Sequence, residues 1–459
     1  MSKSMSPQSN AGDSDAELLK RARQGDAEAQ YVVGQSLMEQ KGNPGAAAKA
    51  VEWLRKAAAQ GHKGARYCMG VAYGYGIGVT KNELAAMKWF RSLEGYGYNG
   101  MEWALMFMGD PDGDMEWVLE ATNARRRRAG MDDIASTFEI KSLTAAEAAD
   151  LMREKGYNLY LDGLEELQPG VAGVLARHRW GMISLSGIKY ISKEDAMILA
   201  RHSGPLCLDG LEALPDDVAE ALANQESGLF LAGISSLSDR ALMILASSTG
   251  DLWLERLESL SVAAAKALGR FKGEMLGLSG LVVLSASVAE GLARYSGNFF
   301  LDGLRELSVG AAAALAKSKA LIHLHGLTRL STEVADALAK HQGGLNLDGL
   351  SSLSSPAAER LAQLDGNLYL NGLMQISDKA ATALGQHRGE LWLDGVKSLS
   401  DMAAKSLAKH EGDLSLRNLA TLSDVGYQAL QKHDCEFAHC LNDQLVEAHQ
   451  AAEEQNNRP

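Results

Sequence analysis

The chain is short of cysteine, proline and aromatic residues for its length. Its 459 residues include four cysteines and eight prolines, and aromatic residues make up 6%. So few cysteines cannot form a framework of disulfides, which favours a reducing compartment. The sequence also has no run of 18 apolar residues, and its start lacks the apolar core of a secretory signal. We therefore expect a cytoplasmic protein without a membrane span, secretion without a cleaved signal being the alternative.

Positive charge is scarce as well. Lys and Arg number 45 against 58 Asp and Glu, a formal net charge of -13. Nucleic acids and anionic membranes attract proteins through a basic face, so we expect neither as a partner. The acidic balance favours a protein or peptide partner with a basic segment.

One concentrated basic run interrupts this pattern. It is ATNARRRRAG at residues 121–130, in which Arg125 to Arg128 are consecutive. Such a run is a candidate nuclear-import or phosphate-binding patch. The simpler interpretation is a solvated helix or linker face that pairs with nearby acids such as Asp132 and Asp133.

A first repeat of 36 residues occupies residues 16–120, with Gly25, Gly61 and Gly97 in register. The segments AEAQYVVGQSLME and AAAKAVEWLRKAAAQG carry apolar residues at helical spacing, with Gly at the breaks. Each unit is therefore predicted to be two antiparallel helices. The third unit has methionines at the expected small positions and is interpreted as a degenerate cap.

The stretch ARYCMGVAYGYGIGV, followed by AAMKWF, resembles the Sel1-like repeat family. The resemblance implies stacked helix hairpins. It also implies an adaptor or scaffold role, which is an analogy at the level of the fold. No catalytic residue comes with it.

A second motif occurs twelve times from Leu159 to Asp434, at spacings of 23 or 24 residues. Its consensus is L-x-L-D-G-L-x-x-L-S-x-x-A-A-x-A-L-A-x-H-x-G-x, in which the alternation LxL predicts a short strand. Gly follows the strand in ten repeats, with Arg256 and Asn418 as exceptions, and we expect it to adopt the positive φ of a tight turn. Ser precedes the helical segment in ten repeats and is predicted to cap the helix, and the Gly after the histidine position is predicted to end it.

One such unit cannot bury its own apolar side, so the units must stack into a curved solenoid, with a parallel sheet on one side and helices on the other. The pattern resembles a bacterial-type leucine-rich repeat, although the usual Asn of LxxNxL is missing. The predicted fold class is a two-part repeat solenoid, all-α Sel1-like hairpins followed by an α/β leucine-rich-repeat-like array. The predicted segments are a disordered tail at 1–15, Sel1-like repeats at 16–120, a basic linker at 121–137, the second array with an N-terminal cap at 138–434, and a C-terminal capping helix and tail at 435–459.

The histidine column of this motif changes its chemistry from repeat to repeat. A metal ligand or catalytic residue has to keep its chemistry, whereas Phe, Tyr and Leu substitute freely here. We interpret these side chains as covering the end of the helix and as hydrogen bonding to nearby carbonyl groups. Its occupants are His178, His202, Gln225, Ser248, Phe271, Tyr295, Ser318, His341, Leu364, His387, His410 and His433.

The residue between the two strand leucines is predicted to point away from the core, onto an exposed face of the sheet. Half of the twelve occupants are aromatic. Stacking between neighbouring strands explains such an excess, and so does a surface that binds a partner, and the sequence leaves both open. The occupants are Tyr160, Ser184, Cys207, Phe230, Trp253, Gly277, Phe300, His323, Asn346, Tyr369, Trp392 and Ser415.

Acids flank this column on the same face, opposed there by Arg417. An Asp before Gly often bonds the backbone of its own turn. The alternative is an acidic, aromatic-lined groove for a basic segment, which would repel a nucleic-acid backbone. The acids are Asp162, Asp209, Glu255, Asp302, Asp348 and Asp394 after the second leucine, and Asp251, Glu390 and Asp413 before the first.

The last cluster, HDCEFAHC at 433–440, brings together His433, Cys435, His439 and Cys440. Zinc favours such ligands, but no partner motif lies elsewhere in the chain. We therefore expect a capping helix with buried cysteines and no metal site.

The columns predict a non-enzymatic interaction scaffold or adaptor with no catalytic, cofactor-binding or metal-binding residues. The alternative is a secreted bacterial effector or surface protein that uses the same face on a host protein or a carbohydrate. An enzyme would need a pocket of constant chemistry, which only the junction at 121–137 could still hold. The predicted partner-binding residues are Tyr160, Phe230, Trp253, Glu255, Phe300, Asp302, Tyr369, Glu390, Trp392 and Asp394.

Overall fold

The chain divides into two compact units in the computed structural model. The first is Met1–Glu120 with Gly156–Asn158, and the second is Ala121–Lys155 with Leu159–Pro459. Among the described residues, no helix has both the length and the apolar character that crossing a membrane requires. The structure describes residues 15–38, 44–60, 62–75, 137–152, 158–178 and 181–432, and also 79, 89, 122, 123, 441, 445, 446 and 449.

The described part of the first unit consists of helices, which confirms the predicted helical hairpins. Gly25 separates the first two helices with φ +103°, the left-handed value that glycine adopts without strain. A Cβ at Gly34 would lie 2.7 Å from Cγ of Leu54, so glycine lets two helices approach closely. The helices are α1 (Asp15–Gln24), α2 (Ala27–Met38), α3 (Pro44–Ala59) and α4 (Lys63–Tyr75).

The second unit contains a parallel sheet of twelve short strands, each paired with the next in chain order. Equivalent motif positions pair with each other, for example Leu368 with Leu391 and Tyr369 with Trp392. The strands are β1 (Leu159–Tyr160), β2 (Ile183–Ser184), β3 (Leu206–Cys207), β4 (Gly228–Phe230), β5 (Asp251–Trp253), β6 (Met275–Gly277), β7 (Asn298–Phe300), β8 (Leu321–His323), β9 (Leu345–Asn346), β10 (Leu368–Tyr369), β11 (Leu391–Trp392) and β12 (Leu414–Ser415).

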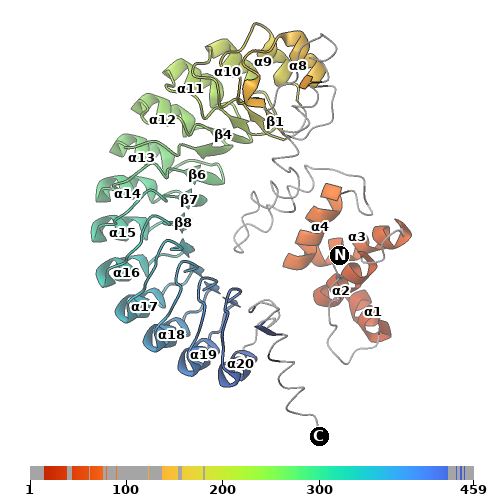
Figure 1. The fold of residues 1–459 in the computed structure, drawn as a ribbon, viewed down its shortest axis with the longest axis vertical. Coiled ribbons are helices and arrows are strands. Elements are labelled where there is room, and N and C mark those ends of the chain that lie inside the picture. The colour runs from red at the N-terminus through yellow and green to blue at the C-terminus, as the bar shows by residue number, and fades with distance from the viewer. Residues whose placement is uncertain are drawn as a thin grey trace. The chain divides into compact units, whose positions relative to one another are not determined.

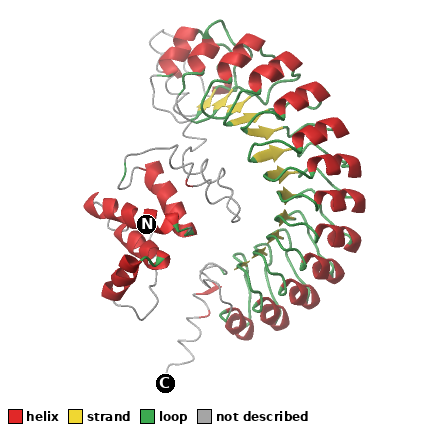
Figure 2. Ribbon diagram, turned by 180° about the vertical axis from the view of Figure 1, so that it is seen from behind, coloured by secondary structure: helices red, strands yellow, loops and turns green. Residues whose placement is uncertain are grey.

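A helix follows each strand, so the predicted order of strand, turn, helix and return is confirmed. In this unit the strands lie along the inner side of an arc and the helices along its outer side (Figures 1 and 2). The short helix η1 (Thr137–Glu139) and α8 (Ala145–Leu151) precede β1. The other helices are α9 (Val171–Leu175), α10 (Lys193–Leu199), α11 (Asp216–Leu222), α12 (Asp239–Leu245), α13 (Val262–Leu268), α14 (Ala286–Leu292), α15 (Val309–Leu315), α16 (Thr332–Leu338), α17 (Ser355–Leu361), α18 (Asp378–Leu384), α19 (Asp401–Leu407) and α20 (Asp424–Leu430).

The serine column determines where the helices begin, as predicted. In ten repeats the serine hydroxyl accepts the backbone N–H three residues later, for example Ala403 N–H to Ser400 at 3.0 Å. Gly170 and Pro215 hold this position before α9 and α11. A cap of this kind stabilises a helix by about 1 kcal/mol.

The core lies between the sheet and the helices and is built from the motif leucines and alanines. Leu391 and Leu393 are 0% exposed, as are Ala403 and Leu407 of α19. Full burial of one leucine side chain contributes about 2 kcal/mol, so each added repeat extends a continuous apolar layer.

The motif glycines have a different role from the one predicted. Among the described residues, no glycine of the turn column has a positive φ, and in the column after the histidine only Gly181 does. The predicted turn geometry and the predicted helix stop are therefore wrong. A Cβ at Gly349 would lie 1.7 Å from the carbonyl oxygen of His325, and one at Gly366 would lie 1.8 Å from that of Gly343. Glycine is required because the backbones of consecutive repeats pass too close together for a side chain.

The described residues at the two ends cover the first and last repeats. Before the first repeat, the Thr144 hydroxyl accepts the N–H of Glu147 at 3.3 Å, and the Glu147 carboxylate accepts the N–H of Thr144 at 2.7 Å. This capping box starts α8. After the last repeat, Leu441 forms a parallel bridge with Leu416.

Candidate functional site

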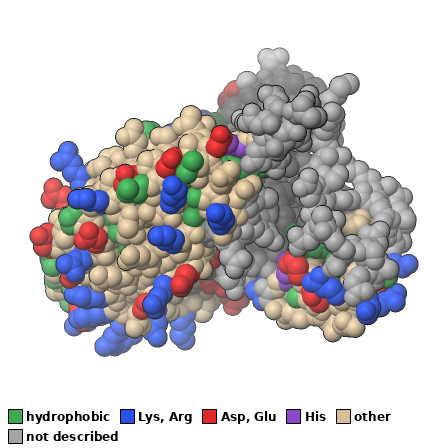
Figure 3. Space-filling view, turned by 90° about the horizontal axis from the view of Figure 1, so that it is seen from below, with side chains coloured by type: hydrophobic (Ala, Val, Ile, Leu, Met, Phe, Trp, Pro, Cys, Tyr) green, Lys and Arg blue, Asp and Glu red, His purple; other side chains and the backbone are tan. Residues whose placement is uncertain are grey.

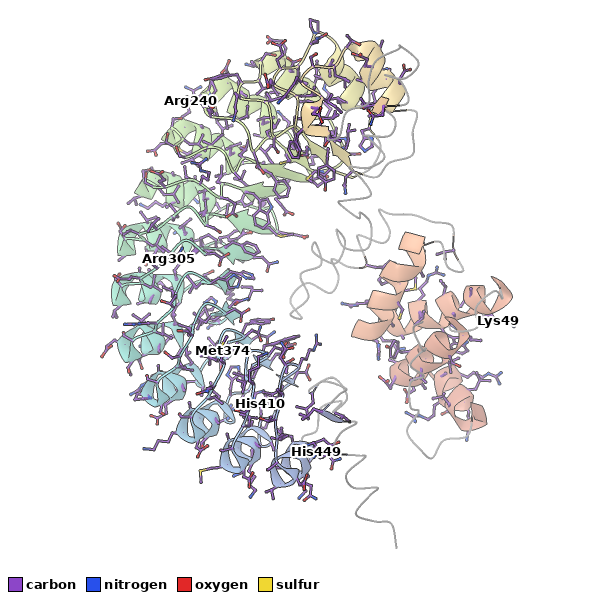
Figure 4. All side chains as sticks on the ribbon, in the orientation of Figure 1. Lys49, Arg240, Arg305, Met374, His410 and His449 are labelled. Atoms are coloured by element: carbon purple, nitrogen blue, oxygen red, sulfur yellow. The ribbon has the colours of Figure 1, made fainter. Side chains whose placement is uncertain are left out.

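Two columns of side chains line the inner side of the arc. The strand column is the residue between the two strand leucines, from Tyr160 to Ser415, and the acid column lies two residues further on, from Asp162 to Arg417. Both columns face away from the leucines, because alternate residues of a strand point the same way. Figure 4 shows side chains along this side, and it shows Arg240 on the outer helices. On the side of the solenoid seen in Figure 3, side chains of both charges are interspersed.

The strand column is less exposed than predicted. Tyr369 has 6% of its surface exposed, and the polar occupants Ser184 and Ser415 have 4% and 6%. The prediction of an exposed face is wrong for this column, because each side chain is partly covered by its neighbours on adjacent strands. The half-buried aromatic residues are Tyr160, Phe230, Trp253, Phe300 and Trp392.

Four rings in contact form what we call the ring ladder, namely Phe230, Trp253, Phe300 and His323. The ring centroids of Phe230 and Trp253 are 5.7 Å apart with planes 2° from parallel, and those of Phe300 and His323 are 4.1 Å apart. Trp253 and Phe300 are 4.9 Å apart although β6 lies between their strands. Such a pair contributes about 0.5 to 1.5 kcal/mol beyond its buried area. Stacking, one of the two explanations for the aromatic excess, is therefore confirmed.

Gly277, the strand-column residue of β6, makes the ladder continuous. A Cβ at Gly277 would lie 2.5 Å from Cε3 of Trp253 and 2.4 Å from Oε1 of Glu255. Both side chains of β5 therefore lean over β6, and the indole reaches Phe300. Nε1 of Trp253 is buried and, within the part of the chain that the structure describes, has no hydrogen-bond partner.

A second aromatic pair lies at the other end of the array. The rings of Tyr369 and Trp392 are 5.7 Å apart and stacked. Nε1 of Trp392 donates to the Glu390 carboxylate at 3.5 Å. The guanidinium of Arg417 lies 5.4 Å from the indole centroid of Trp392, within the range of a cation–π contact.

The aspartates of the acid column bond the next repeat and not their own turn, so the predicted turn bond is wrong. In each case Oδ1 accepts the backbone N–H of the acid-column residue one repeat later. The bonds join Asp162 to Ser186 (2.8 Å), Asp209 to Ala232 (2.7 Å), Asp302 to His325 (3.0 Å), Asp348 to Asn371 (2.7 Å) and Asp394 to Arg417 (2.9 Å). These acids therefore hold consecutive repeats together.

The acid column alternates with a period of two repeats. The odd-numbered strands β1 to β11 lead to the six acids Asp162, Asp209, Glu255, Asp302, Asp348 and Asp394. The even-numbered strands lead to Ser186, Ala232, Ser279, His325, Asn371 and Arg417. Like charges on adjacent strands are thereby avoided. The signal is present in the sequence, but it emerges only when odd and even repeats are compared.

Two members of the acid column are basic residues of the chain itself, and both are exposed. His325 lies between two acids, with Nδ1 3.2 Å from Oδ1 of Asp302 and Nε2 4.0 Å from Oδ2 of Asp348. Arg417 follows Asp394 and covers Trp392. The six acid-column positions that follow the even-numbered strands hold no acid, and we call these positions the gaps. Each gap comes after an acid of the column, and every gap except that of Arg417 also comes before one.

Burial and like charges perturb the titration of this face. Burial raises the pKa of Glu255, and the charges of Asp302 and Asp209 raise it further, while Ser279 opposes the shift by hydrogen bonding. Burial lowers the pKa of His323 to about 3, so the last ring of the ladder is neutral. The carboxylate of Glu255 is therefore close enough to Asp209 and Asp302 for their charges to act on its titration.

The acids before the first leucine do not form a second row on this face. Asp251 is 5% exposed, and its carboxylate accepts the N–H of Met275 at 3.0 Å. Glu390 is half-buried beside Trp392, and Asp413 is exposed. Asp251 is therefore too buried to contact a partner.

Three members of the histidine column bond carbonyl oxygens, as predicted, but the oxygens belong to the preceding repeat. Nε2 of His202 lies 2.9 Å from the oxygen of Gly181, and Nε2 of His341 lies 2.8 Å from that of Ala320. The Tyr295 hydroxyl donates in the same way at 3.1 Å. Burial lowers the pKa of His202, His341 and His387, in agreement with a packing role.

Several predicted features lie outside the described residues. They are the N-terminal tail before residue 15, the arginine run Arg125 to Arg128 and the cluster at 433–440. Within the described ranges, no group of three or more His, Cys, Asp or Glu side chains is arranged to hold a metal ion. The thiol of Cys207 is buried, and burial raises its pKa to about 11.

The family model of the Sel1 repeat matches residues 27–62 and 65–93 of this chain. The N-terminal repeats are Sel1 repeats. The twelve units of strand, turn and helix that follow them are leucine-rich-repeat-like. Repeat arrays of both kinds typically serve as protein–protein interaction modules and generally carry no catalytic site.

Three solved structures that match this chain share little sequence with it and have TM-scores of 0.38 or less. An internalin from Listeria monocytogenes is 17% identical with a TM-score of 0.35, covering 72% of this chain and 95% of its own. The Rad7 and Elc1 complex from yeast is 14% identical with a TM-score of 0.38, covering 74% and 94%. A Sel1 repeat protein from Oxalobacter formigenes is 17% identical with a TM-score of 0.17, covering 52% and 78%. No curated protein matches the sequence.

Proposed function

We propose that this chain is a non-enzymatic interaction scaffold. Its leucine-rich-repeat-like array binds a protein or peptide with a basic segment along the inner side of the arc. The observation that supports this proposal is the acid column, which places a carboxylate on every second strand of that side. The net charge of -13 favours such a partner over nucleic acid or an anionic membrane, and we propose a cytoplasmic location.

The acids can bind a partner without giving up their structural bonds. In Asp162, Asp302 and Asp394 the bond to the next repeat ends on Oδ1. A carboxylate has about four lone-pair sites, so capacity remains for a Lys or Arg side chain. Charge-assisted bonds of this kind are stronger than neutral ones.

The aromatic residues contribute edges rather than faces to a partner. The planes of Phe230 and Trp253 face each other, as do those of Phe300 and His323. Flat stacking of a sugar ring needs an uncovered aromatic face, so this arrangement disfavours a carbohydrate target. The aliphatic stems of Lys and Arg, in contrast, pack well beside ring edges. The predicted partner residues of the strand column, Tyr160, Phe230, Trp253, Phe300, Tyr369 and Trp392, are therefore proposed as flanks of the acids.

The proposal is tested with the full chain and a fluorescein-labelled peptide that carries three arginines. The test variant is Glu255→Gln with Asp302→Asn, which removes two charges. It should keep the fold, because an amide oxygen can accept the same inter-repeat bond as a carboxylate. In the acid column itself, Oδ1 of Asn371 accepts the N–H of Asp394 at 2.9 Å. The matched control is Glu290→Gln with Glu359→Gln, which removes two charges from the outer helices α14 and α17.

Fluorescence anisotropy at several salt concentrations should show that the inner-face variant binds at least about tenfold more weakly than the control, as expected for charge pairs on one surface. The loss should shrink as salt rises, because the pairs are screened. Equal affinities of the two variants would show that the inner face is not the binding surface.

A further inference from the structure

We infer that the basic segment bound by the inner face is an extended polyproline II peptide whose Lys or Arg residues recur at every third position. This inference rests on the proposed function and adds the conformation and the residue spacing of the partner. The observations that carry it are the alternation of the acid column and the two gaps that the chain fills with the basic side chains of His325 and Arg417.

The first step is the distance between equivalent acids. Neighbouring strands lie about 4.7 to 4.9 Å apart, so acids on every second strand repeat at about 9.4 to 9.8 Å. The tips of side chains on the concave side of an arc converge slightly, which places the useful spacing at the lower end of this interval. A partner that contacts successive gaps must repeat its cations at the same distance.

The second step is what fits a gap. His325 occupies the gap between Asp302 and Asp348, with a ring nitrogen directed to each carboxylate. Arg417 occupies the gap after Asp394 and lies against Trp392. The chain thus shows that a ring with two nitrogens fits between two of these acids, and that a guanidinium fits after an acid and beside an aromatic ring.

The other gaps hold short or neutral side chains. They are Ser186, Ala232, Ser279 and Asn371. The first three are consecutive gaps at β2, β4 and β6, and they run beside Phe230 and Trp253 of the ring ladder. None of these three gaps holds a basic side chain, although Asp209, Glu255 and Asp302 are close enough for their charges to act on one another. We therefore place the bound peptide at these three gaps.

The third step is the conformation of the peptide. A polyproline II helix rises about 3.1 Å per residue with three residues per turn, so positions i, i+3 and i+6 share one side and repeat every 9.3 Å or so. A β-strand places residues i and i+3 on opposite sides. An α-helix offers i and i+7 at about 10.5 Å, which is too long for a converging face. Polyproline II is the regular conformation that matches the acids.

The experiment compares labelled peptides of identical composition with the full chain. Arg-Pro-Pro-Arg-Pro-Pro-Arg-Pro-Pro places its arginines at every third position, and Pro-Pro-Pro-Arg-Arg-Arg-Pro-Pro-Pro clusters them. We expect the first to bind roughly tenfold more tightly at physiological salt, since only its charges reach three gaps at once. Equal binding, or tighter binding of the clustered peptide, would overturn the inference and leave the proposed function standing. Binding of neither peptide would refute the proposed function itself.

A pair of variants tests the gaps directly. Ser279→Arg fills the gap at β6 as His325 fills that at β8, and it should weaken the spaced peptide more than the clustered one. His325→Ser removes the basic side chain from the gap at β8, so that four consecutive gaps from β2 to β8 are open. This variant should increase the advantage of a spaced peptide with four arginines over the spaced peptide with three. If both variants leave these ratios unchanged, the gaps do not set the spacing and the inference fails.

Discussion

Oδ1 of Asp302 accepts the backbone N–H of His325, one repeat later, at 3.0 Å, and the same atom lies 3.2 Å from Nδ1 of the His325 ring. One carboxylate therefore joins two repeats through the backbone and orients a side chain between two acids. Asp302 thus has a structural role in addition to its place in the proposed binding face.

Substitution of Asp302 should separate its two roles. Asp302→Ala removes the acceptor of the His325 N–H and should lower the free energy of unfolding by about 1 to 2 kcal/mol. Asp302→Asn should lose clearly less, because an amide oxygen replaces the acceptor, as it does at Asn371. Urea unfolding followed by circular dichroism measures both. An equal loss in the two variants would mean that the charge, and not the backbone bond, stabilises the array.

Gly349→Ala should be among the most damaging small substitutions in this chain. The new Cβ would lie 1.7 Å from the carbonyl oxygen of His325, so the repeats must separate, at a cost above about 2 kcal/mol. Gly173→Ala in α9 is the control, because no atom lies within 4 Å of its Cβ position. That change should raise stability by about 0.5 to 1 kcal/mol, since alanine favours the helix. Thermal unfolding compares the two, and a harmless Gly349→Ala would contradict the close approach.

Trp253 and Trp392 should differ in their contribution to stability. Trp253 stacks on Phe230 and makes a tilted contact with Phe300, so Trp253→Ala should cost about 2 to 4 kcal/mol. Trp392→Ala removes one ring contact and one cation–π contact and should cost about 1 to 2 kcal/mol. Urea midpoints from far-ultraviolet circular dichroism give the order. The reverse order would show that the ring ladder adds nothing to stability.

Stability should fall in mild acid because of the buried histidines. The pKa values of His202, His341 and His387 lie below the ordinary 6.5 because burial disfavours the charged ring. The unfolded chain therefore binds more protons as the pH falls below about 6.5, and the free energy of unfolding decreases with it. The stability that the neutral, buried histidines allow is fully present above that pH and is lost below it.

A double variant isolates this effect. His341→Gln with His387→Gln removes two titrating groups, and glutamine serves in the same column, where Gln225 donates to the oxygen of Gly204 at 2.9 Å. Melting temperatures between about pH 7.5 and pH 5 should fall less for the variant than for the parent chain. Parallel curves would assign the pH dependence to other groups.

Much of the fold was predictable because its determinants are local and periodic. The LxL alternation and the 23-residue spacing predicted the twelve strands and their register, since each strand has to bury the same two leucines. Ser400 and its equivalents predicted the helix starts, because a cap bond spans only three residues. The acids and rings of the candidate site were also found, since residues two apart in a strand share one side.

What only the tertiary structure decided are the interactions between one repeat and the next. The sequence does not state how closely two backbones approach, so it predicts a positive φ for Gly349 in its turn, whereas glycine is needed there because the backbone passes so close to His325. For the same reason the rings were expected to be exposed, the aspartates were expected to bond their own turns, and His202 was expected to cover its own helix. Each of these side chains reaches about 4.8 Å sideways to the neighbouring strand. These contacts exist only between stacked repeats, so the sequence of a single repeat cannot predict them.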